Sequence, residues 1–211
     1  MTDSLNQTIH ILELFKTHYA DVKIALDYET PFQLLVAVML SAQCTDKAVN
    51  KVTKDFFQEV KQAEDLLSWT ISDLEKTFAP LGLFRMKARA VYHTARDIVE
   101  RFDNAVPSTI QDLISLQGVG KKTASVVANE LYDHHVIAVD THVFRVTQRI
   151  GLVEPDSDRN RIADRLNQVV PFEYRLKAHH WFIAHGRLIC QARKPKCHGC
   201  FLAQLCPSAQ I

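Results

Sequence analysis

The sequence predicts an all-α protein, and two observations support this fold class. First, three stretches have the spacing of a capping box, in which side chains satisfy backbone N–H groups that the first helical turn leaves unpaired. They are Thr30–Gln33, Ser72–Glu75 and Ser108–Gln111. Second, apolar residues recur at helical spacing, whereas the two-residue alternation of a strand is scarce. Only residues 136–139 (VIAV) look strand-like, and this run is short.

The first of these stretches predicts a helix that begins at Pro31. Thr30 is a suitable cap, and proline is favoured at the first helical position. The following residues, 32–40 (FQLLVAVML), are apolar nearly all round, which is typical of a helix buried at the centre of a domain. Asp46 is expected to cap a further helix that starts at Lys47.

Composition limits the classes of protein to consider. The 211 residues, 47% of them hydrophobic, are enough for one large core or two smaller ones. The longest apolar run, Leu34–Leu40, is far shorter than the roughly 18 residues that a membrane span needs. The N-terminus lacks the basic and apolar regions of a signal peptide. We therefore expect a cytoplasmic protein without a membrane segment.

Charge alone does not decide whether the protein binds nucleic acid. The formal net charge is +1, so only local clustering of basic residues would be informative. One such cluster lies in residues 185–198, which contain four Lys or Arg residues and no acid. A run of this kind is often a solvated face, so on its own it does not establish binding.

Residues 116–131 (LQGVGKKTASVVANEL) resemble phosphate-binding chemistry at first sight. They are not a P-loop, because Gly118 and Gly120 are too close together and a helix, not a strand, is predicted before them. A dinucleotide fingerprint would need a third glycine and a preceding strand. What remains is a helix over about 108–116, a glycine turn and a helix from Lys121. Such a hairpin presents amides that can bind a DNA phosphate without reading sequence.

This hairpin resembles the helix-hairpin-helix of the DNA glycosylases related to endonuclease III. The similarity extends to residues 139–146 (VDTHVFRV), which resemble the acidic site of that family, to LLVAVMLSAQCTDKAVNK and GLFRMKA earlier in the chain, and to four cysteines near the C-terminus. It covers most of the chain, in order. The hairpin departs from the family pattern at Gln117, where the family usually has proline.

The resemblance implies a fold, a substrate and an activity. Two helical domains would flank a DNA-binding cleft: residues 23–135 as a bundle ending in the hairpin, and residues 1–22 with 136–211 around the four cysteines. The implied enzyme is a base-excision-repair glycosylase that removes oxidised pyrimidines from duplex DNA and nicks the abasic strand through a lysine Schiff base. Its partner would be double-stranded DNA with a damaged base or an abasic site. We expect a monomer that acts at the nucleoid.

Lys122 matches the nucleophile of the family. A lysine attacks a sugar only as a neutral amine, and Lys121 beside it, with the positive end of its own helix, disfavours the charged form. Alternatively, Lys122 is an exposed lysine that only touches phosphate. Asp140 matches the acidic residue, which would stabilise positive charge on the sugar. As a helix cap it would also have a structural role.

Five further residues are expected to contact DNA, from the resemblance and the hairpin. Gln43 matches the residue that the family places in the base stack, and Leu83 matches its wedge. Structural alternatives are a polar helix end for Gln43 and loop packing for Leu83. Gly118 and Gly120 would let the hairpin backbone approach DNA, with Lys121 beside them.

The C-terminal cysteines have the spacing C-x6-C-x2-C-x5-C, and four cysteines within seventeen residues predict a metal site. Zinc and an iron–sulfur cluster both accept four thiolates, so the spacing alone leaves the metal open. The resemblance implies a 4Fe–4S cluster, with zinc as the alternative, bound by Cys190, Cys197, Cys200 and Cys206. The loop between the first two ligands carries Arg193, Lys194 and Lys196, which are expected to meet DNA phosphates. Cys44 is expected to be a buried free thiol.

Three other functions are consistent with parts of the sequence. A monofunctional mismatch or adenine glycosylase would share the cysteines, but such relatives generally lack lysine at position 122. A metal-stapled DNA-binding module would need the hairpin and the cysteines but neither Lys122 nor Asp140. An electron-transfer protein would need only the cluster. Lys122 is therefore the residue that discriminates among them.

Overall fold

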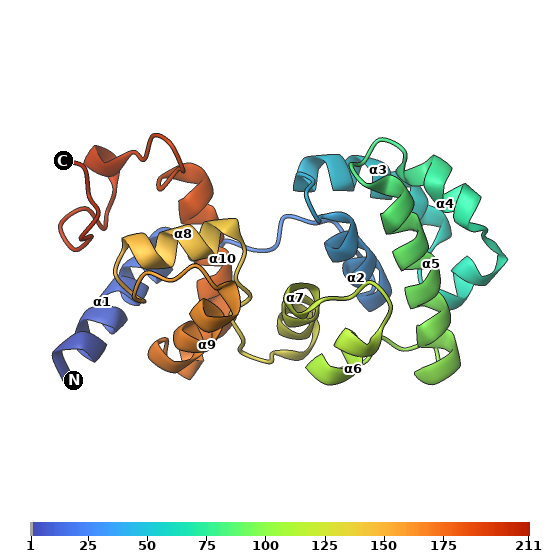
Figure 1. Ribbon diagram of the computed structural model, residues 1–211, viewed down its shortest axis with the longest axis horizontal. Coiled ribbons are helices and arrows are strands. Elements are labelled where there is room, and N and C mark those ends of the chain that lie inside the picture. The colour runs from blue at the N-terminus through green and yellow to red at the C-terminus, as the bar shows by residue number, and fades with distance from the viewer. Residues whose placement is uncertain (1) are drawn as a thin grey trace. The chain divides into compact units, whose positions relative to one another are not determined.

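The structure is a computed structural model that describes residues 2–211, with side chains described from residue 5 onward (Figure 1). Its regular secondary structure is helical throughout that range, without a strand. The chain divides into two compact units, one formed by Met1–Ile24 with His134–Ile211 and the other by Ala25–Asp133. The all-α prediction is confirmed.

The unit formed by residues 25–133, here the hairpin unit, is a bundle of short helices. Its elements are α2 (Pro31–Leu40), α3 (Asp46–Glu59), the 3-10 helix η1 (Ala63–Ser68), α4 (Ile71–Phe78), α5 (Phe84–Arg101), α6 (Ile110–Ser115) and α7 (Lys121–Tyr132). Helix α2 is its centre, as predicted: every residue from Phe32 to Leu40 is buried, and α2 packs against α3, α5 and α7. The buried amide of Gln33 donates to the carbonyls of Phe57 and Val60 at 3.0 and 2.9 Å.

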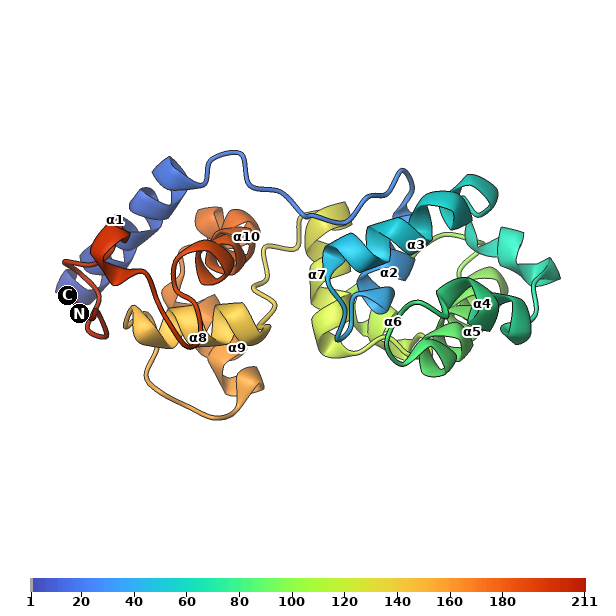
Figure 2. The ribbon, with the colours of Figure 1, turned by 90° about the horizontal axis from the view of Figure 1, so that it is seen from above.

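The other unit, here the cysteine unit, contains α1 (Thr2–His18), α8 (Thr141–Arg149), α9 (Arg159–Val169), α10 (Phe172–Leu188) and the 3-10 helix η2 (Cys197–Gly199). Helix α10 packs against both α8 and α1. Phe15 of α1 is fully buried, and its ring packs edge-on against Phe182 and Phe201. Figure 2 shows the C-terminal loop beside α1, where the His18 ring stacks on Phe201 with 3.9 Å between centroids.

Thr30 caps α2 as predicted, and its side chain accepts the amide of Gln33. Three other predicted caps were wrong by one or two residues. Asp46 and Ser72 lie inside their helices, and a helical residue cannot place its side chain over the free amides of its own first turn. Threonines in extended conformation cap these helices instead: Thr45 for α3, where Asp46 was expected, Thr70 for α4, where the box Ser72–Glu75 was expected, and Thr109 for α6, where Ser108–Gln111 was expected.

Residues 136–139 form no strand, although their sequence looked strand-like. Side chains satisfy part of this backbone: Asn167 accepts the Ile137 amide at 3.2 Å, and the His179 ring hydrogen-bonds the Ala138 carbonyl at 2.9 Å. Ile137, Ala138 and Val139 are buried, which explains the apolar pattern without a sheet. Separately, among the described residues no helix combines the length and hydropathy that a membrane crossing requires.

Candidate nucleic-acid site and metal centre

The two glycines of the hairpin have different environments. Gly118 has φ +87°, and a Cβ there would lie 2.5 Å from the Cβ of Ala90 on α5, so both the turn and the packing require glycine. Gly120 caps α7 with an ordinary negative φ, and nothing lies within 4 Å of where its Cβ would be. Gly118 is therefore explained within the unit, whereas the open space at Gly120 leaves the first amides of α7 accessible to an external anion.

Gln117, at the position where proline was the expected family residue, is held by α5. Its backbone N–H donates to a carboxylate oxygen of Asp97 at 2.9 Å, and its backbone carbonyl accepts a hydrogen bond from the Thr94 hydroxyl at 2.5 Å. Proline has no N–H and could not make the first of these bonds. The hairpin is therefore fixed by two hydrogen bonds to α5 in place of a rigid ring.

Lys121 and Lys122, the predicted phosphate contact and nucleophile, occupy the first turn of α7, which begins at Lys121 as expected. Both side chains are exposed. Among the side chains of residues 5–211, neither amine forms an ion pair with a carboxylate. Both amines are therefore accessible to a substrate beside the open turn at Gly120.

Asp140 caps α8, as expected. One carboxylate oxygen, Oδ1, accepts the amides of His142 and Val143, both at 2.8 Å, so Oδ2 lies outside the cap. The side chain is half-buried. The cap fixes the carboxylate rigidly at the start of α8, while its second oxygen can contact another group.

His142 has a packing role that the sequence only partly indicates. Burial lowers the pKa of its imidazole, and the Asp140 carboxylate partly opposes this shift. A Cβ added at Gly186 of α10 would lie only 2.9 Å from the Cβ of His142. The absence of a side chain at Gly186 therefore allows α8 and α10 to pack closely against each other. We did not single out Gly186 from the sequence; the signal was a glycine inside an otherwise helical stretch.

Gln43 and Leu83 are both exposed and both have left-handed backbones, with φ +56° and +59°. A left-handed residue other than glycine is uncommon, and the associated strain is of order 1–3 kcal/mol. Gln43 lies between α2 and α3, and Leu83 caps α5. Met86, in the first turn of α5, is 68% exposed and was missed from the sequence, where it reads as an ordinary helix residue.

Cys44 is half-buried, not buried as predicted, because it lies in the exposed turn after Gln43. Its sulfur has a partner that no local pattern indicates: Lys87 Nζ lies 3.0 Å from Cys44 Sγ. Lys87 itself is only 6% exposed. This contact joins the turn that carries Gln43 to the helix that begins after Leu83.

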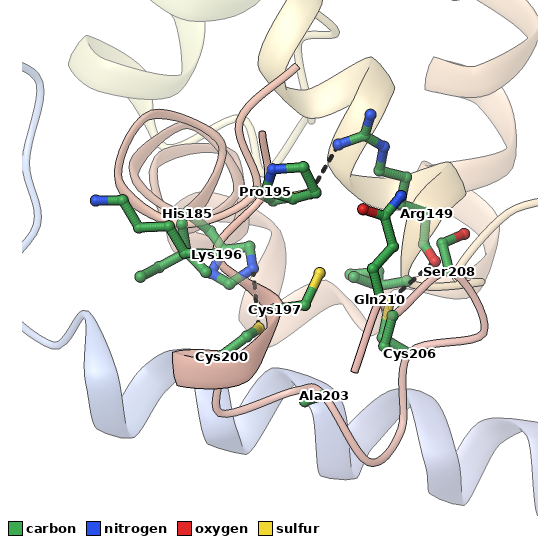
Figure 3. Close-up of a pocket in the computed structure, with 14 residues that line it drawn as sticks. Arg149, His185, Pro195, Lys196, Cys197, Cys200, Ala203, Cys206, Ser208 and Gln210 are labelled. Carbon is green, nitrogen blue, oxygen red and sulfur yellow. Dashed lines mark hydrogen bonds between the residues drawn. The ribbon is translucent and has the colours of Figure 1, made fainter. Parts of the chain in front are cut away.

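The four C-terminal cysteines line one cavity of about 110 Å³. Figure 3 labels Cys197, Cys200 and Cys206 there. Cys190 follows α10, Cys197 and Cys200 lie at the two ends of η2, and Cys206 lies in the last loop. None of them is in a disulfide. The structure therefore brings together all four predicted ligands, while Cys44 belongs to the other unit.

The chemistry of this cavity fits a multinuclear cluster. Burial raises the pKa of the Cys200 and Cys206 thiols, and the neighbouring cysteines raise both further. Coordinated iron would supply the positive charge that lets all four ionise. A single zinc ion, with Zn–S bonds of about 2.3 Å, would draw four sulfurs to about 3.8 Å of one another. Over residues 2–211 no group of three or more His, Cys, Asp or Glu side chains is gathered closely enough for one ion.

Two residues that the sequence did not single out contact the cysteine sulfurs. Arg149 Nη1 of α8 lies 3.6 Å from Cys190 Sγ and also donates to the Gln191 carbonyl at 2.8 Å. His185 Nε2 of α10 lies 3.6 Å from Cys200 Sγ (Figure 3). Burial lowers the pKa of His185 to about 4. Neither contact could be found from spacing, because each joins segments that are separate in sequence.

Arg193, Lys194 and Lys196 are exposed on the loop between the first two cysteines. The backbone of this loop is fixed at both ends. Arg149 Nη2 donates to the Ala192 carbonyl at 3.0 Å, and the Lys196 amide donates to the Ile189 carbonyl at 3.0 Å. The three cationic side chains are thus displayed on an anchored loop.

Comparisons with known proteins agree with this arrangement. The HhH-GPD superfamily of base excision DNA repair proteins matches residues 36–172, and the iron–sulfur binding domain of endonuclease III matches residues 190–206. Endonuclease III of Haemophilus influenzae is 40% identical over 204 residues, which are 96% of each chain.

Two solved structures are also similar to this chain. One is a non-covalent endonuclease III–DNA complex and the other a trapped endonuclease III–DNA covalent intermediate. Each has a TM-score of 0.92 and 36% identity, covering 97% of this chain and 96% of the other. The cofactor of this chain is accordingly a 4Fe–4S cluster. By sequence and fold, the chain belongs to the endonuclease III family within the HhH-GPD superfamily.

Proposed function

We propose that this protein removes oxidised pyrimidines from duplex DNA, as a monomer, and nicks the resulting abasic strand with Lys122 as nucleophile. Membership of the family makes it a bifunctional DNA glycosylase and abasic-site lyase of base excision repair. The observation that carries the proposal is the exposed Lys122 amine in the first turn of α7, directly after the open turn at Gly120.

The proposed reaction begins when the damaged nucleotide is flipped out of the duplex. The neutral amine of Lys122 attacks C1′ of the sugar, and the C1′–N bond to the base breaks. The base leaves with a proton, and the ring oxygen accepts another as the sugar opens to a Schiff base. Loss of a C2′ proton then drives β-elimination, which breaks the bond from C3′ to its phosphate oxygen.

In this proposal, Asp140 stabilises the positive charge that develops on the sugar and transfers a proton to or from the lysine. Its cap uses Oδ1 alone, which leaves Oδ2 for this work without loss of the helix start. Because the carboxylate is already fixed by two amides, no reorganisation is needed when the charge appears.

The remaining contacts are proposed to hold and deform the DNA. Lys121 and the first amides of α7 would bind a phosphate, because the turn at Gly118 and Gly120 leaves those amides accessible. Gln43 and Leu83 would occupy the space left by the flipped base, and their left-handed backbones support this role because such strain concentrates at functional sites. Arg193, Lys194 and Lys196 would bind further phosphates. Acting on chromosomal DNA, the enzyme would work at the nucleoid in the cytoplasm.

We propose that Cys190, Cys197, Cys200 and Cys206 hold the cluster, supported by the cavity that they surround. When bound, the cluster supplies a redox-active centre that also cross-links the C-terminal loop. Base removal and strand nicking, as proposed, use only side chains of the chain itself.

Borohydride trapping tests the nucleophile. Protein with full cluster absorbance is mixed with a duplex bearing one thymine glycol, reduced, and any covalent adduct is mapped by mass spectrometry. Lys122→Ala is compared with Lys121→Ala as the matched control. We expect an adduct on Lys122 that is absent in Lys122→Ala and retained in Lys121→Ala.

Other outcomes would redirect the assignment. Base release without an adduct would favour the monofunctional glycosylase. Binding without base release or an adduct would favour the non-catalytic DNA-binding module. An adduct on another lysine would keep the lyase activity but remove Lys122 from its role.

A further inference from the structure

A buried chain of polar groups connects Tyr19, the residue after α1, to the cysteine cavity. The Tyr19 hydroxyl lies 3.1 Å from His185 Nδ1, and His185 Nε2 lies 3.6 Å from Cys200 Sγ. Tyr19 is 8% exposed and His185 is 1% exposed. The His185 ring is packed edge-on between Phe15 and Phe201, so it cannot turn away from either partner without disturbing that packing.

The direction of these hydrogen bonds follows from the cluster. A sulfur bound to iron carries no proton, so His185 Nε2 must be the donor and Cys200 Sγ the acceptor. A neutral imidazole that donates from Nε2 accepts at Nδ1, and the Tyr19 hydroxyl is therefore the donor there. The chain runs in one direction, from the tyrosine O–H through the ring to the thiolate.

We propose that Tyr19 and His185 are positioning residues that stabilise the electron-rich form of the 4Fe–4S cluster through Cys200. Hydrogen bonds to cluster sulfurs are among the features that set the potential of such a cluster. A donor to the thiolate draws electron density from iron, which favours the more reduced member of whichever redox couple is followed. Tyr19 strengthens the donor because hydrogen bonds in a chain polarise one another.

The position of this chain is specific to one ligand. Cys190 has Arg149 as its donor, and the Leu202 amide at 3.4 Å is a second, backbone donor to Cys200. Removing the Tyr19 hydroxyl therefore changes one hydrogen bond at one sulfur and leaves the charge and the other donors in place. This makes Tyr19→Phe the sharpest probe.

The test is protein-film voltammetry of the DNA-free holoprotein, with cluster content measured by iron analysis. We expect the midpoint potential to become more negative in Tyr19→Phe, and more so in His185→Phe. His185→Gln, whose amide can donate at the position of Nε2, should return the potential toward that of the wild type. Tyr174→Phe is the matched control, because Tyr174 of the same unit hydrogen-bonds Glu13 and takes no part in the cavity.

A second readout separates hydrogen bonding from general loosening. Resonance Raman bands of the Fe–S(Cys) bonds should shift to higher frequency in Tyr19→Phe, since a weaker donor leaves a stronger Fe–S bond. If His185→Phe fails to load the cluster, Tyr19→Phe with full iron content still decides the matter. An unchanged potential and unchanged Raman bands in fully loaded Tyr19→Phe, or an equal shift in Tyr174→Phe, would overturn the proposal.

Discussion

Lys87 Nζ lies 3.0 Å from Cys44 Sγ, and this contact links the turn that holds Gln43 to the helix that begins after Leu83. Both of those residues are exposed and left-handed. Each turn would be mobile alone, because an exposed loop has few contacts to order it. The contact therefore holds in register the two side chains that are proposed to enter the DNA stack.

Breaking this contact should weaken DNA binding. Lys87→Met keeps an apolar stem of similar length but removes the donor, and Cys44→Ala removes the acceptor. We expect each to raise the Kd for a duplex with an abasic analogue about fivefold, corresponding to about 1 kcal/mol for one hydrogen bond. Fluorescence anisotropy of labelled duplex measures the effect.

The double variant distinguishes a shared contact from two independent effects. If the pair acts as a unit, the double variant should bind about as well as either single variant. Fully additive losses would mean that the two residues act separately.

The two hairpin glycines should respond differently to alanine. Gly118→Ala places a Cβ against Ala90 and strains a positive φ, so we expect the free energy of unfolding to fall by more than about 1 kcal/mol. Gly120→Ala should leave stability near that of the wild type and weaken duplex binding, since its Cβ would enter open space proposed for phosphate. Denaturant unfolding and anisotropy measure the two effects. Unchanged DNA affinity in Gly120→Ala would contradict a phosphate at that turn.

Asp140 should show separate structural and chemical roles. Asparagine is also a good cap, so Asp140→Asn is expected to keep the free energy of unfolding within about 0.5 kcal/mol of wild type. It should nevertheless lose about 100-fold or more in single-turnover base release, because the charge is gone. Asp140→Ala should lose that activity and about 1 kcal/mol of stability as well. A fully active Asp140→Asn would reduce Asp140 to a cap.

The basic loop should govern the salt dependence of binding. Each phosphate contact contributes about 0.9 to the slope of log Kd against log salt concentration. Replacing Arg193, Lys194 and Lys196 together by glutamine should therefore lower the slope by about 2 to 3, without changing cluster absorbance. Lys54→Gln, at an exposed lysine of α3, is the control. An unchanged slope in the triple variant would leave the loop outside the DNA interface.

The sequence predicted features that depend on local patterns. The buried helix after Thr30, the hairpin with α7 starting at Lys121, and the cap at Asp140 were all correct, because apolar spacing and capping chemistry act within a few residues. The same local reasoning misplaced three other caps. Ser72, Ser108 and Asp46 are good capping residues by type, but in each case a threonine one or two positions away has the extended backbone that a cap requires.

Contacts between distant segments could not be predicted in this way. Nothing in the spacing of Cys44 or Lys87 indicates that they meet across 43 positions, and Arg149 is 41 positions from Cys190. For the same reason, the sequence shows Gln117 only as a departure from the family pattern. Its compensation lies on α5, 20 positions away, where Asp97 accepts its amide.

The Tyr19–His185 hydrogen bond spans 166 positions of sequence, which has a consequence for biosynthesis. The hairpin unit is a continuous segment, so it can fold on the ribosome as soon as it has emerged. Helix α1 is translated first, but it cannot pack within the cysteine unit until α10 and the last cysteine have also been translated. Residues such as Phe15, fully buried in the finished protein, would be exposed during that interval. A nascent chain that stalls after the hairpin unit should therefore be a chaperone client through α1, and cluster insertion should be the step that ends that dependence.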